Sequence, residues 1–203
     1  MDNSKTKLER PCLEQAKKYL DDWAHNERFQ YSDKGLNKLF SLLPNNTDTG
    51  EVLIKAAALN SIYSTNIFKI STVAEHIVKL SIDKYLAAGD ISVVNKLAQV
   101  DYNGKIINFF SFATKYCNFH KPEIYPIFDQ YVGKTLWHWL KVDNYYKCSR
   151  NELRDYNVFF EVISSFRSFY KLEELSFKKL DQYIWEYGNE HFGRETKVKE
   201  QAS

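Results

Sequence analysis

The stretch NFFSFATKYCNFHKPEIYPIFDQYV, residues 108–132, joins an apolar helical run, a connector between two prolines and the start of a second helix. Lys115 lies inside the apolar run, and Asp129 follows fourteen positions later, where the second helix begins. An amine among aromatic side chains loses hydration, so its pKa falls and the neutral form becomes available as a nucleophile. A carboxylate at a helix N-terminus is kept ionised by the free backbone amides and the helix dipole. Such a pair could attack and stabilise an electron-poor carbon, for example the anomeric carbon of a deoxyribose.

A simpler interpretation of the same two residues stays open. A lysine can run its aliphatic chain along apolar surface and leave its amine in water. An aspartate in front of a helix commonly serves only as a cap. On residue types alone, this simpler interpretation of Lys115 and Asp129 is the one favoured.

Outward from this stretch, apolar residues recur with helical spacing along almost the whole chain. The 203 residues include only 7 glycines and 4 prolines, and so few chain-breaking residues argue against an all-β fold. Two short runs, ISVV at 91–94 and KIIN at 105–108, resemble strands, but each lies within a helical pattern. The sequence therefore predicts an all-α domain of about nine helices. They are expected at residues 13–24, 32–43, 51–64, 71–82, 91–100, 107–120, 129–141, 149–170 and 176–192.

Composition limits the setting of the protein. Hydrophobic residues make up 44% of the chain, enough for a core, and the formal net charge is +2. A mean hydropathy of −0.49 without a long apolar run predicts no membrane span. The first ten residues, MDNSKTKLER, lack the apolar core of a secretory signal, so a cytoplasmic location is expected. We expect one domain over residues 1–193 and a polar tail at 194–203.

Other kinds of site find little support in the sequence. There is no glycine-rich phosphate loop and no nucleophile elbow. Cys117 and His120 share a C-x-x-H spacing, but a metal site needs further ligands that this pair lacks. The three cysteines are expected to be free thiols in a reducing compartment. We therefore expect neither a metal nor a cofactor.

The central stretch resembles the catalytic region of the helix-hairpin-helix (HhH-GPD) DNA glycosylases, in the branch similar to 8-oxoguanine DNA glycosylase. In that family, a hairpin of the form G-V-G-T-K-x-A is followed by a short connector and P-V-D. SFATKYC at 111–117 stands in the place of the hairpin, and PIFD at 126–129 stands in the place of P-V-D. The resemblance implies that Lys115 is the Schiff-base nucleophile. It also implies that Asp129 stabilises the oxocarbenium-like state and relays protons.

The same resemblance implies a fold of two helical lobes with a cleft between them. It covers about residues 59–136, with the hairpin at 106–119. The segment STNIFKI at 64–70 resembles the family's Asn-rich turn, in which an asparagine fills the gap left by an extruded base; Asn66 would be that residue.

Further residues are expected to contact DNA. Phe128 and Tyr131 flank Asp129 and are expected to line the pocket for the extruded base. The remaining candidates occupy the hairpin positions or surround the site in sequence, and would meet phosphates. They are Ser111, Ala113, Lys105, Lys121 and Lys134.

The sequence also departs from the family pattern. Ser111 and Ala113 replace the two hairpin glycines, whose freedom at positive φ lets backbone amides approach a phosphate. We therefore expect a reshaped hairpin with a weaker hold on phosphate. The connector from Lys115 to Asp129 is short, and the family's N-terminal β domain has no counterpart. These differences bear on DNA binding more than on the chemistry of the lysine and the aspartate.

The predicted activity is that of a DNA glycosylase and AP lyase that acts on a damaged or modified base extruded from duplex DNA. Two alternatives stay open. One is a helical DNA-binding module without catalysis. The other is a helical protein-interaction domain, in which the aromatic residues, 16% of the chain, form a groove for a partner.

Overall fold

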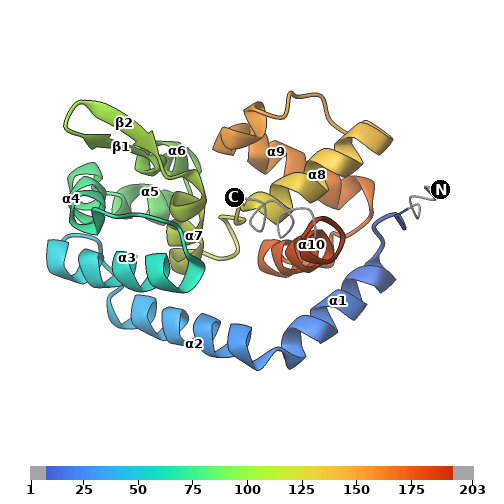
Figure 1. Ribbon diagram of the computed structural model, residues 1–203, viewed down its shortest axis with the longest axis horizontal. Helices are drawn as coiled ribbons and strands as arrows, with labels where there is room; N and C mark the ends of the chain where they lie inside the picture. The colour runs from blue at the N-terminus through green and yellow to red at the C-terminus, as the bar shows by residue number, and fades with distance from the viewer. Residues whose placement is uncertain (1–7, 194–203) are drawn as a thin grey trace, which may run out of the picture.

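A computed structural model, which describes residues 8–193, shows a mostly helical protein whose helices gather into two lobes (Figure 1). Within these residues there are ten α-helices, one 3₁₀ turn and one two-stranded sheet. The predicted tail at 194–203 and the first seven residues lie outside the described part. The elements are α1 (Leu13–His25), α2 (Glu27–Leu42), α3 (Thr49–Tyr63), α4 (Ile70–Leu80), α5 (Asp83–Ala88), α6 (Ser92–Ala98), β1 (Gln99–Tyr102), β2 (Lys105–Asn108), α7 (Phe110–His120), α8 (Gln130–Asp143), η1 (Glu152–Arg154), α9 (Tyr156–Phe169) and α10 (Phe177–Phe192).

The chain begins in one lobe, builds the other and then returns. In the first lobe α1 packs against α10, and α10 packs against α8. In the second lobe α3 contacts α2, α4 and α7, and α6 packs against α7. α9 contacts α8 on one side and α6 on the other, so it joins the lobes (Figure 1). Segments from both ends of the sequence thus make one lobe, and the middle of the chain makes the other.

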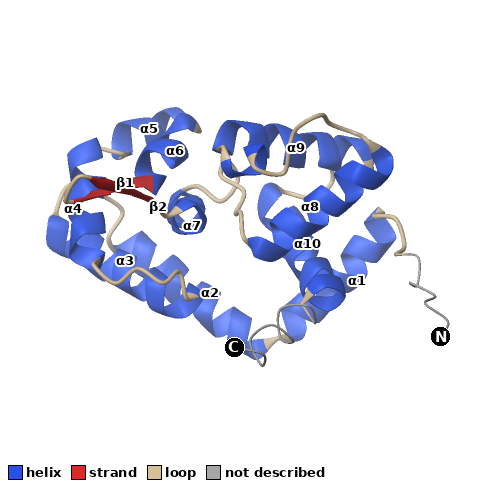
Figure 2. Ribbon diagram, turned by 45° about the horizontal axis from the view of Figure 1, so that its top comes forward, coloured by secondary structure: helices blue, strands red, loops and turns tan. Residues whose placement is uncertain are grey.

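The structure departs from the all-helical prediction between residues 99 and 108. β1 and β2 form an antiparallel hairpin in which Val100 is opposite Ile107 (Figure 2). Its turn residues, Asn103 and Gly104, have φ values of 55° and 84°. Asn-Gly is the pair that two-residue hairpins favour, because both turn positions need positive φ. The run KIIN was ambiguous in its apolar spacing, and the Asn-Gly pair in front of it is the signal that favours a strand.

A β-hairpin followed by one helix takes the place of the helix-hairpin-helix expected at 106–119. α7 is continuous from Phe110 to His120, and the Ala113 amide donates to the Phe109 carbonyl at 3.0 Å. Neither Ser111 nor Ala113 has positive φ, so this helix has no need of glycine there. Serine and alanine at these two positions are compatible with this continuous helix.

Side-chain caps fix where several helices begin. Asp129 and Ser176 cap α8 and α10, as their positions in the sequence predict. Ser149 was expected to start one long helix. Ser149 and Glu152 do bond each other's backbone amides, but they enclose only the 3₁₀ turn, and α9 begins after its own cap, Asp155.

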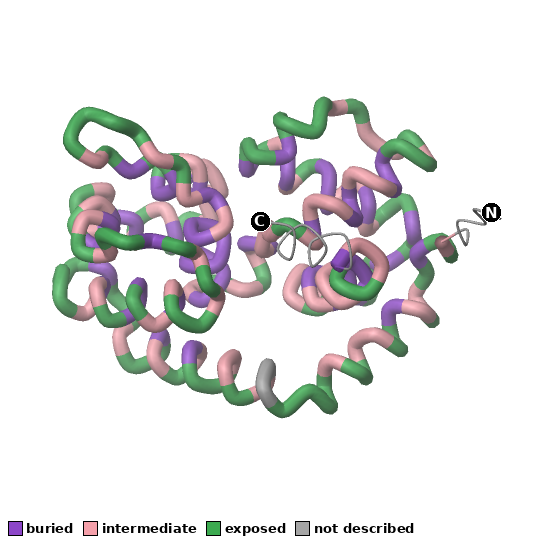
Figure 3. The backbone as a smooth tube through the Cα atoms, in the orientation of Figure 1, coloured by how far each residue is buried: buried purple, intermediate pink, exposed green. Residues whose placement is uncertain are grey.

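The interior of each lobe is rich in aromatic rings, which accounts for much of the aromatic excess in the sequence. Buried positions line the inner faces of the helices and exposed positions lie outside (Figure 3). No helix in the described part of the chain is long and apolar enough to cross a membrane. The largest fully buried aromatic side chains are Trp139, Tyr116, Tyr125, Tyr156, Tyr183, Tyr187, Phe112, Phe159 and Phe166.

Candidate active site

A cavity of about 750 Å³ is lined by residues of both lobes. One wall comes from the end of α3, the loop after it and the first turns of α7. The opposite wall comes from α10 and from the connector that enters α8. Its volume falls in the range of small-molecule sites. Lys115 and Asp129 both line it, so the structure brings the two predicted catalytic residues to one cavity.

Lys115 projects from α7 into this cavity with only 4% of its surface exposed. Its Nζ donates to Ser111 Oγ, one helical turn earlier, at 2.6 Å. The amine also lies over the Tyr63 ring, 5.4 Å from the centroid. Burial lowers the pKa of Lys115, while the charges of Asp129 and Asp181 act in the opposite direction. The surface-extended lysine of the simpler interpretation is therefore not what the structure contains.

Asp129 is held at the start of α8 by its own capping bonds. Its Oδ1 accepts from the Tyr131 amide at 2.8 Å and from the Val132 amide at 2.9 Å. Both bonds fix the orientation of the carboxylate. Oδ2 makes no hydrogen bond to any described residue, so it is available to a molecule in the cavity. Capping and chemistry are thus compatible roles for this one residue.

Asp181 is a third acidic residue of the cavity, and the sequence analysis missed it. It lies on α10, is 7% exposed, and its Oδ1 has no hydrogen-bond partner in the described structure. Burial, followed by the nearby charge of Asp129, raises the pKa of Asp181 well above its ordinary value, against the pull of Lys115. The raised pKa favours the protonated form of this carboxyl group, which could donate a proton. One signal was available, because Asp181 shares the apolar stripe of its helix with Ile184 and Gly188.

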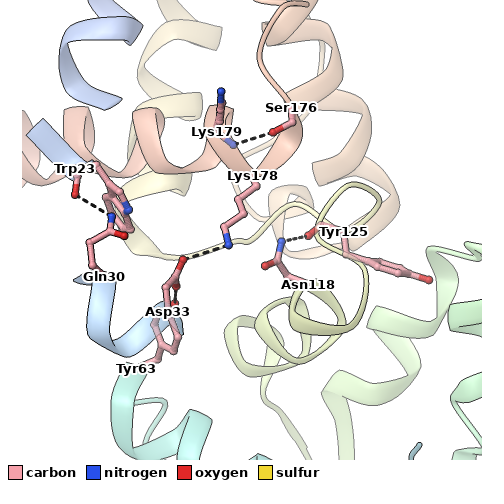
Figure 4. Close-up of polar contacts among 9 residues, drawn as sticks. All are labelled: Trp23, Gln30, Asp33, Tyr63, Asn118, Tyr125, Ser176, Lys178 and Lys179. Atoms are coloured by element: carbon pink, nitrogen blue, oxygen red, sulfur yellow. Dashed lines mark hydrogen bonds and ion pairs between the residues drawn. The ribbon is translucent and has the colours of Figure 1, made fainter. Parts of the chain in front are cut away.

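An ion pair crosses the cavity between the lobes. Lys178 Nζ of α10 lies 3.2 Å from Asp33 Oδ2 of α2 (Figure 4). The other oxygen of Asp33 accepts from the Tyr63 hydroxyl, also at 3.2 Å. Below them, Asn118 of α7 donates to the Tyr125 carbonyl at 2.7 Å and holds the connector against that helix (Figure 4). These contacts hold helices that are far apart in sequence around the Lys115 amine.

The aromatic residues predicted for the pocket line it, but they differ in how they are held. Tyr131 meets Trp185 edge-on at 5.6 Å between ring centroids. Phe128 is wedged between Phe110 and Phe159, at 5.1 Å and 5.3 Å, so part of its surface belongs to the core. Tyr131 is the better candidate for contact with a bound base.

The predicted phosphate-binding residues are scattered. Ser111 lines the cavity, but Ala113 is buried and its amide is used within α7, so neither its side chain nor its N–H can reach a phosphate. Lys105 is exposed on the β-hairpin and does not line the cavity. Lys134 donates to the Phe192 carbonyl at 3.1 Å. Lys121 borders a second, smaller cavity of about 380 Å³.

Asn66 lies at the edge of the main cavity. It is exposed and has a φ of 58°, a conformation that asparagine tolerates better than most residues. This geometry agrees equally with an ordinary turn residue.

A separate buried polar cluster lies beside the smaller cavity. Lys55 of α3 is fully buried and donates to the carbonyls of Leu43 and Asn45 and to Asn46 Oδ1, at 2.8–2.9 Å. Asn46 in turn bonds Asp83 and the ring of His120. Burial lowers the pKa of Lys55 to about 8 and that of His120 to about 3.

His120 is therefore part of this cluster, whereas its C-x-x-H partner Cys117 is fully buried. No group of three or more potential metal ligands occurs among the described residues.

Comparisons with known proteins supply a family but no activity. A family model described as HI_0787_N, N-terminal domain, matches residues 15–124. A Haemophilus influenzae protein with the printed name "Uncharacterized protein" is 43% identical over 134 residues, which are 66% of this chain and 64% of that relative. This match therefore extends over less than two thirds of the relative's length. No solved structure matches the chain. The family match includes Lys115 and ends before Asp129 and Asp181.

Proposed function

The chain belongs to the HI_0787_N family, and we propose that it acts as a DNA glycosylase with AP lyase activity. One observation carries the proposal: a buried lysine amine, a capped carboxylate and a buried carboxyl group with a raised pKa line the same cavity. These groups are Lys115, Asp129 and Asp181. The resemblance of the central stretch to the glycosylase family supports the roles of Lys115 and Asp129, and the role of Asp181 rests on its place in the cavity and its raised pKa.

The cavity would receive a nucleotide that has left the helix, since an amine cannot reach the sugar of a stacked base. Aromatic rings from both lobes line the space, and rings of this kind stack on extruded bases. Its lining includes as many basic as acidic side chains: Lys115, Arg154 and Lys178 against Asp33, Asp129 and Asp181. A net negative lining would have favoured the protein-interaction alternative.

The first chemical step would form a bond between Nζ and C1′ while the bond from C1′ to the base breaks. The bonding electrons leave with the base, which needs a proton. Asp181 can supply it, because its raised pKa favours the protonated carboxyl group and its Oδ1 has no hydrogen-bond partner among the described residues. The positive charge that develops on the sugar lies near the Asp129 carboxylate, which stabilises it.

The second step would convert the adduct to a Schiff base. The nitrogen gives up one proton to the Asp129 carboxylate, which passes it to O4′ as the C1′–O4′ bond breaks, and C1′ and Nζ are then joined by a double bond. The Asp129 carboxylate, free again, then accepts a proton from C2′. The electrons of that C–H bond form a double bond between C2′ and C3′ as the C3′–O bond breaks, so the 3′ phosphate leaves with its electron pair and the strand is nicked. The lowered pKa of Lys115 makes the neutral amine accessible at the start of this sequence.

Borohydride trapping tests the proposal. The full chain is incubated with borohydride and duplex DNA that contains either an abasic site or 8-oxoguanine opposite cytosine. We expect a covalent protein–DNA adduct that disappears in Lys115→Gln. Lys55→Gln is the matched control, because it alters the other buried lysine. No adduct on either duplex, or an adduct that survives Lys115→Gln, would refute the enzymatic assignment.

A further inference from the structure

Among the described residues, only one ion pair has both of its members in the lining of the main cavity. It joins Lys178 of α10 to Asp33 of α2, with 3.2 Å between Nζ and Oδ2 (Figure 4). The Lys178 side chain is 32% exposed and that of Asp33 is 18% exposed, so solvent reaches both groups. Ion pairs that water still reaches contribute little to stability, and their members can change partners at little cost. The two lobes are therefore joined here by a contact that a competing charge can open.

One aromatic side chain separates this ion pair from the Lys115 amine. The Tyr63 hydroxyl donates to Asp33 Oδ1 at 3.2 Å, and the centroid of the same ring lies 5.4 Å from Lys115 Nζ. A nucleotide whose sugar reached that amine would carry a phosphate on each side of the sugar. Because only the Tyr63 ring lies between, a phosphate next to this sugar would come close to Lys178 and Asp33.

The beginning of α10 adds to the attraction for an anion. Lys178 and Lys179 lie in the first turn of this helix, directly after its cap Ser176, and the turn contains no acidic residue (Figure 4). The helix dipole places partial positive charge at that end, so the two lysines oppose the dipole rather than complement it. An acidic group from elsewhere compensates this arrangement, and Asp33 fills that role. A phosphate is also anionic and accepts from the same ammonium donors, so it can take the place of this carboxylate.

We propose that Lys178 exchanges Asp33 for a phosphate of the DNA backbone when a nucleotide enters the cavity. The inference rests on the proposed function and adds a binding residue to it. Lys105 and Lys121, which the sequence analysis expected to meet phosphates, do not line this cavity. Asp33 acts as a competitor, because it holds the lysine in the free protein and must be displaced before the phosphate binds. After the exchange, Asp33 keeps its hydrogen bond from Tyr63.

DNA binding at equilibrium tests the exchange apart from catalysis. The duplex carries a tetrahydrofuran analogue of an abasic site, which has no C1′ hydroxyl and cannot form a Schiff base. Fluorescence anisotropy gives the dissociation constant over a range of salt concentrations. Lys178→Met should weaken binding by about 5- to 10-fold at low salt. It should also lower the slope of log Kd against log salt by about one, the change expected for one lost phosphate contact. Lys178→Arg should preserve both the affinity and the slope.

Asp33→Asn gives the distinguishing sign. If Asp33 competes with phosphate, its loss frees Lys178 and should tighten binding by about 2- to 5-fold. The gain should vanish in the Lys178→Met background, because no lysine is then left to release. Binding is compared rather than rate, since the charge of Asp33 also raises the pKa of Asp181. Lys17→Met and Glu174→Gln alter an exposed ion pair outside the cavity, so these matched controls should change the affinity by less than about 2-fold.

The outcomes separate this inference from the proposed function. Unchanged affinity and salt slope in Lys178→Met would refute the exchange and leave the glycosylase standing. Weaker binding by Asp33→Asn would identify a purely structural ion pair, and equal tightening in both backgrounds would identify long-range repulsion; either result refutes the exchange. If the wild type forms no borohydride adduct but shows the expected binding pattern, the enzyme is refuted and the exchange stands. If Asp33→Asn increases the affinity for inorganic phosphate and not for DNA, Lys178 serves a free anion and the DNA contact is refuted.

Discussion

The molecule contains two buried lysines, and they are in opposite situations. Lys55 is enclosed in the buried polar cluster beside the smaller cavity, and Lys115 faces the large cavity between the lobes. Burial lowers the pKa of both. Lys55 donates to three oxygens, which is the full capacity of an ammonium group. Lys115 donates only to Ser111. Burial prepares an amine for reaction, but only an amine with unused bonding capacity and adjoining space can react.

The two lysines also differ in the parts of the chain that they hold together. Lys55 ties the chain between α2 and α3 to the body of its lobe through two carbonyls and one amide. Lys115 makes no hydrogen bond outside its own helix, although its amine lies over the Tyr63 ring. Burial with a single hydrogen bond compensates the amine only in part and costs stability, which is typical of functional sites.

The largest expected effect comes from exchanging the functional lysine. Lys115→Gln should reduce adduct formation on 8-oxoguanine DNA by roughly 10⁴-fold or more, the scale on which loss of a nucleophile acts. Its thermal stability should not fall, because a neutral side chain replaces a poorly compensated amine. Single-turnover trapping and a melting curve measure the two outcomes. A variant that keeps its rate would show that the two buried lysines do not differ in function.

The next effect concerns the carboxylate opposite the amine. Asp129→Asn should slow the reaction by about 10²- to 10⁴-fold, since the amide cannot accept the proton or balance the developing charge. Asparagine is nearly as good a helix cap as aspartate, so α8 should remain stable to within about 0.5 kcal/mol. Rates and urea unfolding of the same preparation test both halves. If the loss of rate were fully accounted for by a loss of folded protein, Asp129 would act only as a helix cap.

Removal of the structural lysine should give the reverse pattern. Lys55→Met leaves the Leu43 and Asn45 carbonyls without their donor and removes one of the donors to Asn46 Oδ1, at a cost of about 2–5 kcal/mol in the free energy of unfolding. The trapping rate per folded molecule, measured at a temperature where the variant is folded, should stay within about 2-fold of wild type. A selective loss of trapping with unchanged stability would place Lys55 in the chemistry.

The smallest expected effect is a shift of the pH–rate profile in the variant Ser111→Ala. The Ser111 hydroxyl accepts a bond from the protonated amine and so favours the ammonium form. Ser111→Ala removes this bond, which lowers the pKa of Lys115 further. The rate depends on the neutral amine, so the rising limb of the pH–rate profile should move to lower pH, by less than about one pH unit. A shift to higher pH would show that Ser111 does not stabilise the charged amine.

The sequence anticipated the helical character and the place of most helices, because apolar spacing depends on the local chain. It also placed the caps at Asp129 and Ser176, whose side chains bond amides only two or three residues away. The sequence analysis missed the β-hairpin because the apolar spacing of KIIN fits a helix as well as a strand. The turn residues Asn103 and Gly104 were the signal that favoured a hairpin. The helix-hairpin-helix predicted at 106–119 was wrong for a related reason. Because positions 111 and 113 are not glycines, the backbone there continues as a helix.

The proposed pair of Lys115 and Asp129 could be recognised from residues 108–132 only with the help of the family resemblance, since residue types alone favoured a surface lysine and a helix cap. Asp181 could not be joined to them from sequence, because α10 reaches the cavity only after the chain has crossed between the lobes twice. The same holds for the bond between Asp33 and Lys178 and for the enclosure of Lys55. Helix formation and capping depend on neighbours within a turn or two. Burial, pKa and the contents of a cavity depend on residues that only tertiary packing brings together, so the chain's pattern determined the helices and the assembled lobes decided which lysine is free to react.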